Sequence, residues 1–122
     1  MATLKTIEIK AFVPAKDYAL SKRFYKDMGF TMASDTDGIA YFHCGATSFL
    51  LQDFYVKELA DNFMMHMLVH DVDAWWATLQ ASNLAGNYGV QISPIVEQPW
   101  RMRDFVVFDP SGVLWRIGQN NE

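Results

Sequence analysis

Residues 13–30, VPAKDYALSKRFYKDMGF, contain the end of a strand and a helix with both of its boundaries. Asp17 is a residue type that caps helix N-termini, and Gly29 is the type that most often follows a helix C-terminus. Between them, apolar side chains recur at helical spacing: Leu20, Phe24, Tyr25 and Met28. The stretch therefore predicts a helix between Asp17 and Gly29, and residues 5–15 before it are predicted to form a strand.

Three short strands are predicted after this helix, in FTMAS (30–34), GIAYFHC (38–44) and TSFLLQDF (47–54). The same order then begins again with a strand in FMMHMLV (63–69) and a second helix capped by Asp71. Its apolar residues are Val72, Trp75, Trp76 and Leu79, and both tryptophans are expected in the core. NLAGNYG (83–89) is predicted to be a turn, and strands are predicted at 90–97, 103–109 and 112–118.

This repetition predicts an α+β fold made of two βαβββ modules, residues 5–54 and 63–118, within one domain of residues 1–122. In each module a helix covers one face of the sheet, which leaves the other face without a partner. Two such sheets side by side are expected to form a curved, cup-like mixed sheet with the helices outside. The concave face of the cup is the predicted ligand pocket.

The composition excludes several classes of partner. A net charge of -4 argues against binding to a phosphate backbone, and no apolar run has the length of a membrane span. Hydrophobic residues make up 51% of the 122 residues, enough for a core. The single cysteine, Cys44, has no intramolecular disulfide partner, and the first residues lack the features of a signal peptide. A cytoplasmic protein is therefore expected.

Two stretches, VPAKDYALSKRFYKDMGF and EQPWRMRDFVVFDPSGVLWRIGQ (97–119), resemble the vicinal oxygen chelate superfamily of glyoxalases, extradiol dioxygenases and bleomycin-resistance proteins. The resemblance is greatest to the bleomycin-resistance branch and extends over nearly the whole chain. It implies the paired βαβββ fold and a homodimer. In the enzymes of the superfamily it also implies a divalent metal, held by side chains from the first and last strand of each module.

The residues at the corresponding positions argue against such a metal. These positions fall on Lys10, one of residues 49–51, Met64 and Arg116. Lysine and arginine are cationic donors and do not replace carboxylate or imidazole ligands. A thioether is a poor ligand for the hard or borderline metals of these enzymes. We therefore expect no such metal site, no cofactor and no catalytic residue.

Strand alternation predicts which side chains face the cup. Phe12, Gln52 and Arg116 are predicted to face it, because their strand neighbours suit the helix side. His66 is predicted to face it together with Met64, which lies two residues before it in the same strand. Two alternatives stay open here. His66 is either a ligand contact or a hydrogen-bonded strand residue. Arg116 binds a ligand, forms an ion pair with an acid such as Asp104, or does both.

Trp100 lies in a loop after Pro99, without a periodic pattern that would bury it. In the family that the chain resembles, this loop borders the ligand groove and normally has a glycine after the tryptophan. Here Arg101 stands at that position. Trp100 is predicted to stack on a flat or cationic ligand, and Arg103 is predicted to bind the same ligand.

The resulting hypothesis is a non-catalytic protein that sequesters a flat aromatic or cationic, antibiotic-like small molecule in a groove of a homodimer. The alternative is a metal-dependent glyoxalase or dioxygenase of the same superfamily, which requires metal ligands that the chain lacks at the expected positions. An enzyme of this fold that uses no metal is a third possibility, and no motif supports it.

Overall fold

The computed structural model describes residues 3–121. The first half contains, in order, β1 (Phe12–Pro14), α1 (Tyr18–Met28), β2 (Thr31–Thr36), β3 (Ile39–Cys44) and β4 (Thr47–Gln52). A short helix, α2 (Lys57–Asp61), leads into the second half. That half contains β5 (Met64–Leu68), α3 (Val72–Ala81), α4 (Leu84–Tyr88), β6 (Val96–Gln98), β7 (Met102–Phe108) and β8 (Leu114–Asn120).

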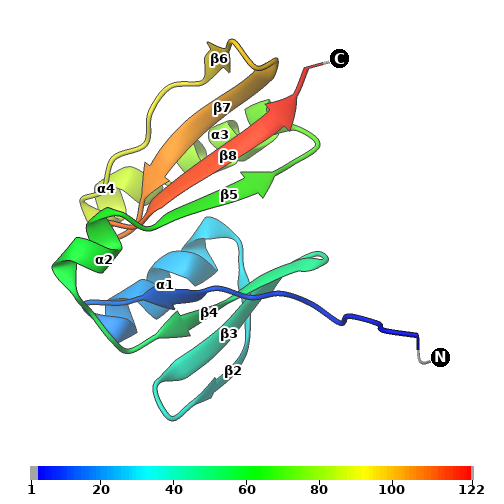
Figure 1. Ribbon diagram of the computed structural model, residues 1–122. Coiled ribbons are helices and arrows are strands. Elements are labelled where there is room, and N and C mark those ends of the chain that lie inside the picture. Colours follow the sequence, from blue (N-terminus) through cyan, green and yellow to red (C-terminus); the bar gives the residue numbers. More distant parts are fainter. Residues whose placement is uncertain (1–2, 122) are drawn as a thin grey trace.

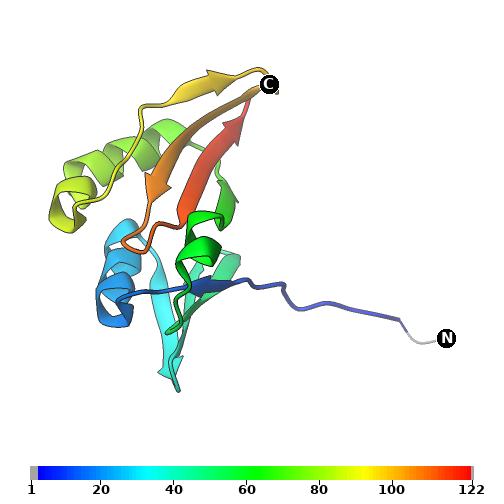
Figure 2. The same ribbon diagram turned by 60° about the vertical axis from the view of Figure 1, so that its left-hand side comes forward.

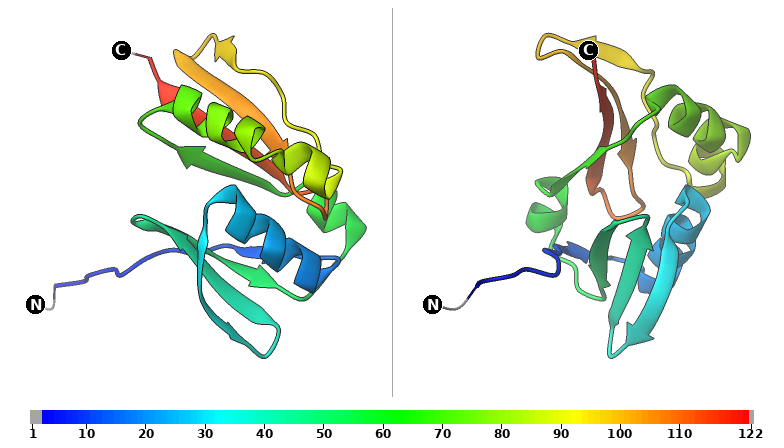
Figure 3. Two further views of the ribbon diagram at one scale, coloured as in Figure 1. Left: turned by 180° about the vertical axis from the view of Figure 1, so that it is seen from behind. Right: turned by 90° about the vertical axis from the view of Figure 1, so that its right-hand side faces the viewer.

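The strands form two four-stranded mixed sheets, ordered β1-β4-β3-β2 and β5-β8-β7-β6 (Figure 1). In both sheets the first strand pairs in parallel with the last, and the remaining pairs are antiparallel. Seen from behind, α1 lies over the first sheet and α3 and α4 over the second (Figure 3). The predicted α+β class and the two βαβββ units are confirmed. We call the sheet faces without helices the open faces.

The core lies on the helix side of both sheets, as strand alternation predicts. Phe42 and Phe49 of the first sheet and Trp115 of the second sheet are at most 3% exposed. Tyr25 of α1 packs between them, with its ring centroid 4.8 Å from that of Phe49 and 5.7 Å from that of Trp115. One aromatic cluster therefore joins the two modules into a single core.

A buried hydrogen-bond network also joins the modules. The Tyr25 hydroxyl donates to Asp109 (2.5 Å) and accepts from the Trp115 indole nitrogen (2.9 Å). Asp109 also accepts from the backbone nitrogens of Ser111 and Val113, so it shapes the turn between β7 and β8. Burial raises the pKa of Asp109, although these hydrogen bonds act in the opposite direction. The DPSG turn is thus fastened to the first module through its aspartate.

Both predicted helix starts are confirmed. The side chain of Asp17 accepts from the backbone nitrogen of Leu20, and that of Asp71 accepts from the backbone nitrogen of Ala74. Gly29, at φ 120, follows the end of α1. Asp and Gly at these positions determine the helix boundaries through local hydrogen bonding and backbone freedom.

The predicted strand at residues 5–15 is wrong for most of its length. Only Phe12–Pro14 pair with β4, and residues 3–11 form an arm that leaves the body of the protein (Figure 2). The alternating side chains of the arm are compatible with a strand, but within residues 3–11 the backbone bond to β4 is made by Ala11, whose carbonyl accepts from the nitrogen of Leu50. Backbone pairing, and not the side-chain pattern alone, decides whether such a segment is a strand.

Two predictions in the second module are also corrected. Residues 84–88 form the short helix α4 and not a turn, with Asn83 and Gly89 in the left-handed region at its ends. The strand predicted at 90–97 is reduced to β6 at Val96–Gln98 and one isolated bridge at Ile92. Pro94 interrupts this segment, because proline has no amide hydrogen for the ladder. Trp75 and Trp76 are half-buried at the margin of the core and not inside it.

None of the helices in residues 3–121 has the length and hydropathy needed to cross a membrane.

Candidate ligand-binding site

The open faces of the two modules have equivalent positions. Phe12 pairs with Leu50 across β1 and β4, and His66 pairs with Arg116 across β5 and β8. Phe12 and His66 each lie five residues before their helix-capping aspartate. Leu50 is therefore the counterpart of Arg116 in the first module, within the range 49–51 that the sequence analysis assigned.

The same equivalence relates Lys10 to Met64, each seven residues before its helix cap. The four positions at which the resemblance expects metal ligands thus hold an ammonium, an aliphatic side chain, a thioether and a guanidinium. These groups do not fit a hard or borderline divalent ion. Elsewhere in residues 3–121, no three His, Cys, Asp or Glu side chains gather closely enough to hold a metal ion.

Arg116 is in an ion pair on the open face of the second sheet. Its Nη1 lies 3.1 Å from Oδ2 of Asp104, a residue that is only 2% exposed. The other carboxylate oxygen of Asp104 accepts from Nε2 of Gln98 at 2.9 Å. The Arg116 side chain is still 32% exposed, so the ion pair that the sequence analysis left open leaves a surface for a ligand.

Several large apolar side chains are exposed on the open faces of the two sheets. Met64 and Leu68 on β5 are 58% and 54% exposed, and Phe12 on β1 is 50% exposed. β1 and β5 are each an edge strand of their own sheet. His66, also exposed, lies between Met64 and Leu68 on the same face of β5. The open faces therefore present an apolar surface near a partly neutralised cation.

Trp100 lies in the turn between β6 and β7 and is 59% exposed, as the absence of a burial pattern predicted. The residue after it, Arg101, has φ 61 in the left-handed region. Glycine occupies this region without steric cost, whereas a residue with a Cβ atom does not. This geometry explains why glycine suits the position after the tryptophan.

The structure does not bring all the predicted ligand residues together. Arg103 alternates with the buried Phe105 and lies on the helix side of β7, where it forms two hydrogen bonds with Asp73 of α3, at 2.7 Å and 2.9 Å. It is therefore on the opposite face of the sheet from Arg116. Gln52, at the end of β4, is half-buried on the open face of the first sheet, two residues beyond Leu50.

Sequence reasoning missed a polar cluster on the first open face. The carboxylate of Glu8 accepts hydrogen bonds from Lys10 (2.7 Å), Tyr41 (2.9 Å) and Ser48. These hydrogen bonds lower the pKa of Glu8 to about 2, and the bond from Lys10 has the largest effect. Lys10 Nζ also lies 5.2 Å from the centroid of the Tyr41 ring. Glu8, Lys10 and Phe12 are spaced two residues apart, so a strand-like segment places them on the same face. This spacing could have identified Glu8 as a residue of the open face.

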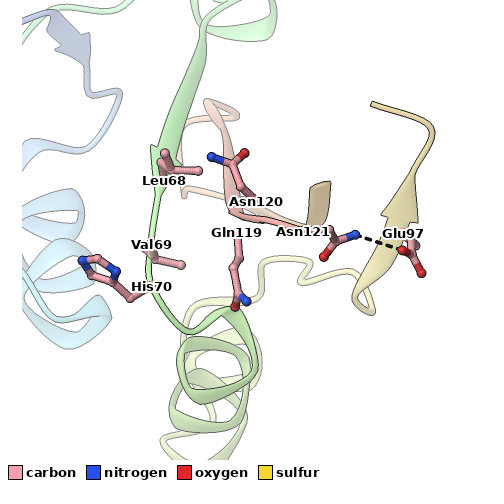
Figure 4. A pocket seen from close by; sticks show the side chains of 7 residues that line it. All are labelled: Leu68, Val69, His70, Glu97, Gln119, Asn120 and Asn121. Carbon is pink, nitrogen blue, oxygen red and sulfur yellow. Dashed lines mark hydrogen bonds between the residues drawn. The ribbon is translucent and has the colours of Figure 1, made fainter. Parts of the chain in front are cut away.

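A second missed feature is a pocket of about 860 Å³ at the edge of the second sheet where β5 and β8 end. Figure 4 shows its walls, which come from the ends of β5, β6 and β8: Leu68, Val69, His70, Glu97, Gln119, Asn120 and Asn121. Asn121 donates to Glu97 at 2.9 Å, and its backbone nitrogen donates to the carbonyl of Arg101 at 2.8 Å. The pocket thus borders the turn that holds Trp100, and its polar groups come from separate strands that the sequence pattern does not connect.

Comparison with protein families finds a match that extends over most of the chain. A family model described as the Glyoxalase/Bleomycin resistance protein/Dioxygenase superfamily matches residues 7–117. A search of curated proteins finds no match to the chain.

Solved structures share the fold at low sequence identity. A bleomycin-binding protein complexed with bleomycin has a TM-score of 0.79 and 20% identity, covering 95% of this chain and 100% of that chain. An antibiotic binding protein from a Streptomyces species has a TM-score of 0.75 and 25% identity, with 99% of both chains covered. A lactoylglutathione lyase from Agrobacterium tumefaciens has a TM-score of 0.69 and 18% identity, with 95% of both chains covered. Antibiotic-binding proteins and an enzyme thus have the same architecture.

Proposed function

Because the chain belongs to the glyoxalase/bleomycin resistance protein/dioxygenase superfamily, we propose that it is a non-catalytic binding protein for a small molecule. The ligand is a flat aromatic or cationic compound of antibiotic type, and it is sequestered in a groove between two copies of the chain. Membership of the superfamily alone does not distinguish binding proteins from enzymes, so the proposal depends on the residues of the site.

The replacement of the metal ligands is the observation that carries this proposal. Lys10, Leu50, Met64 and Arg116 occupy the equivalent positions of the two modules. A lyase or dioxygenase of this superfamily needs anionic or imidazole donors there, and ammonium and guanidinium groups have no lone pair to give to a metal ion. Sequestration needs no such donors, because it requires only affinity.

The surface chemistry supports a flat ligand. Trp100 offers an exposed ring for stacking or cation–π contact, and Met64 and Leu68 offer flexible apolar contacts. Since Asp104 neutralises Arg116, the face does not repel a cationic ligand, while the exposed part of the guanidinium remains available to a carbonyl group. The polar pocket beside the turn at residues 99–101 suits the hydrophilic substituents of such a ligand.

The arm supports the dimer. Leu4, Ile7 and Ile9 are 93%, 100% and 93% exposed in the single chain. Glu8 attaches the arm to its own first sheet, while Ile7 and Ile9 on either side of it are exposed. Large apolar side chains on one segment gain stability when a partner covers them, by about 1.5–3 kcal/mol for each fully buried side chain. The proposed partner is a second copy of the chain, whose addition also closes the groove over the open faces.

A thermal-shift screen of cationic, aromatic and glycopeptide compounds tests the function. A ligand present at about 100 times its dissociation constant should raise the free energy of unfolding by about 2.7 kcal/mol. Trp100→Ala should leave the stability of the ligand-free protein nearly unchanged and weaken the binding of an aromatic hit by about 0.5–2 kcal/mol.

Trp75→Ala is the matched control, because Trp75 is half-buried and packs against the core. It should lower stability by about 2–3 kcal/mol, less than the 3–5 kcal/mol of a fully buried tryptophan, and leave the intrinsic affinity for the ligand unchanged. A screen in which Trp100→Ala binds every hit as tightly as the wild type would contradict the assigned groove. Stoichiometric tightly bound zinc, iron, nickel or manganese in the purified protein would favour the metal-dependent enzyme instead.

A further inference from the structure

His66 and Met102 contact each other across the open face of the second sheet. Nε2 of His66 lies 3.4 Å from Sδ of Met102. The two residues belong to β5 and β7, which are separated by β8 in the sheet. Met102 therefore reaches over an intervening strand to place its sulfur beside the imidazole.

Gly118 on β8 makes this contact possible. It pairs with Leu68 of β5 on one side and with Asp104 of β7 on the other. A Cβ atom at position 118 would lie 2.7 Å from Sδ of Met102, closer than real Cβ contacts allow. The missing side chain thus leaves a channel across β8, and the Met102 side chain fills it. Any other residue at position 118 would displace the sulfur.

An imidazole nitrogen and a thioether sulfur are a donor pair for a soft metal ion. Thioethers select Cu(I) over the harder divalent ions, and imidazole binds copper as well. At bond lengths of about 2.0 Å to nitrogen and 2.3 Å to sulfur, like those of another d¹⁰ ion, donors 3.4 Å apart subtend an angle of about 105° at the metal. The separation of the two atoms therefore matches that of two ligands of one tetrahedral ion.

We propose that His66 and Met102 form a binding site for Cu(I) on this open face. Met64, exposed on the same face of β5 two residues before His66, supplies the nearest further thioether on that strand. The two thioethers and the imidazole are donor types that copper accepts. The nearby charge of Arg116, on the adjacent strand, is balanced by its ion pair with Asp104. The site shares the position of Met64 with the divalent site of the superfamily's enzymes, but it differs from that site in its donors His66 and Met102 and in metal class.

Anaerobic titration of the purified protein with Cu(I), in competition with a chromophoric Cu(I) chelator such as bicinchoninate, measures the affinity. One equivalent should bind to the wild type, and X-ray absorption should show both nitrogen and sulfur neighbours of copper. His66→Gln and Met102→Leu each remove one donor and should weaken Cu(I) binding by about a hundredfold. Changes to residues that only support metal ligands already weaken metal binding by about 10–100-fold, so the loss of a ligand itself should reach the upper end of that range. Gly118→Ala retains both donors and should weaken binding by about tenfold.

Two controls keep the test specific. Met65→Leu removes a thioether from the opposite, helix-facing side of β5 and should leave the affinity unchanged. Cys44→Ala removes the chain's single thiol, which also binds Cu(I), and should retain the tight site. Circular dichroism confirms that each variant is folded.

Loss of binding in Cys44→Ala, or wild-type affinity in both His66→Gln and Met102→Leu, would overturn the proposal. Absence of sulfur scattering in the Cys44→Ala protein would do the same. Met64→Leu reports whether the third donor takes part, since a tenfold loss assigns it to the site. Wild-type affinity in that variant leaves the His66 and Met102 pair as the whole protein contribution. Failure of the copper titration would leave the thermal-shift result with organic ligands unaffected.

Discussion

At the scale of single residues, Arg101 has a backbone conformation that suits glycine. Its φ of 61 lies in the left-handed region, which costs a residue with a Cβ atom about 1–2 kcal/mol. Arg101→Gly removes that cost but gives the unfolded chain more freedom, worth about 0.4–1 kcal/mol. We expect a net stabilisation of about 0.5–1 kcal/mol, measured by urea unfolding. Arg101→Ala retains the Cβ atom and should give no gain, so an equal gain from alanine would show that the arginine side chain, and not the backbone, is the cause.

Arg116 has a structural role that can be separated from any role in binding. Arg116→Met keeps the apolar stem and leaves the carboxylate of Asp104, 2% exposed, with Gln98 as its remaining side-chain partner. Loss of a hydrogen-bonded charge partner should lower the free energy of unfolding by about 1–3 kcal/mol. Asp104→Asn in the same chain should recover part of this loss, because it removes the buried charge. Additive effects of the two substitutions would show that the pair is not energetically coupled.

At the scale of elements, the attachment of the arm is predicted to depend on pH. The pKa of Glu8 is lowered from 4.5 to about 2 by its bonds to Lys10, Ser48 and Tyr41. Because the pKa is lower when the arm is attached, this contribution is complete above pH 4.5 and is lost as the pH falls toward 2. Amide hydrogen exchange or chemical shifts of residues 5–10 should therefore report detachment over that range.

Glu8→Gln is the control for the arm. The variant cannot ionise at position 8, so its arm should exchange faster than that of the wild type at neutral pH and show little change between pH 4.5 and 2. An arm that detaches over the same pH range in both proteins would mean that another group controls it. The prediction concerns the local attachment of an exposed segment and not global stability.

At the scale of the whole molecule, the dimer should depend on the arm. Removal of residues 1–9 deletes Leu4, Ile7 and Ile9 while β1 and its pairing with β4 remain. We expect the wild type to have the mass of a dimer at micromolar concentration in light scattering, and the shortened chain that of a monomer. The variant with Ile7→Lys and Ile9→Lys keeps the length of the arm and should weaken the dimer in the same way. A monomeric wild type would contradict the dimer, and a dimeric shortened chain would show that other surfaces form it.

The two modules are joined so closely that they are expected to unfold together. Tyr25 of α1 contacts Phe49 of its own module and Trp115 of the other, and it donates to Asp109 in the turn between β7 and β8. The internal repeat in the sequence therefore corresponds to two structural units with one shared core.

Local chemistry let the sequence determine much of this fold. Asp17 and Asp71 start helices because their side chains accept hydrogen bonds from backbone groups three residues away, and such bonds need no distant partner. The alternation of Leu114, Trp115 and Arg116 likewise assigned each side chain to a sheet face, because a strand has a period of two. The family resemblance, the four positions without metal ligands and the exposed Trp100 all followed from the same order of residues.

Only the tertiary structure decided which distant side chains meet. Arg103 is next in sequence to residues of the open face, yet it pairs with Asp73, because α3 packs against the opposite side of β7. Residues 5–11 have a strand-like pattern, but the register of β1 with β4 begins only at Phe12, and Glu8 meets β3 and β4 through its side chain. The contact between His66 and Met102 depends on a glycine in a third strand. Each of these outcomes is set by contacts between residues far apart in the chain, which a local pattern does not encode.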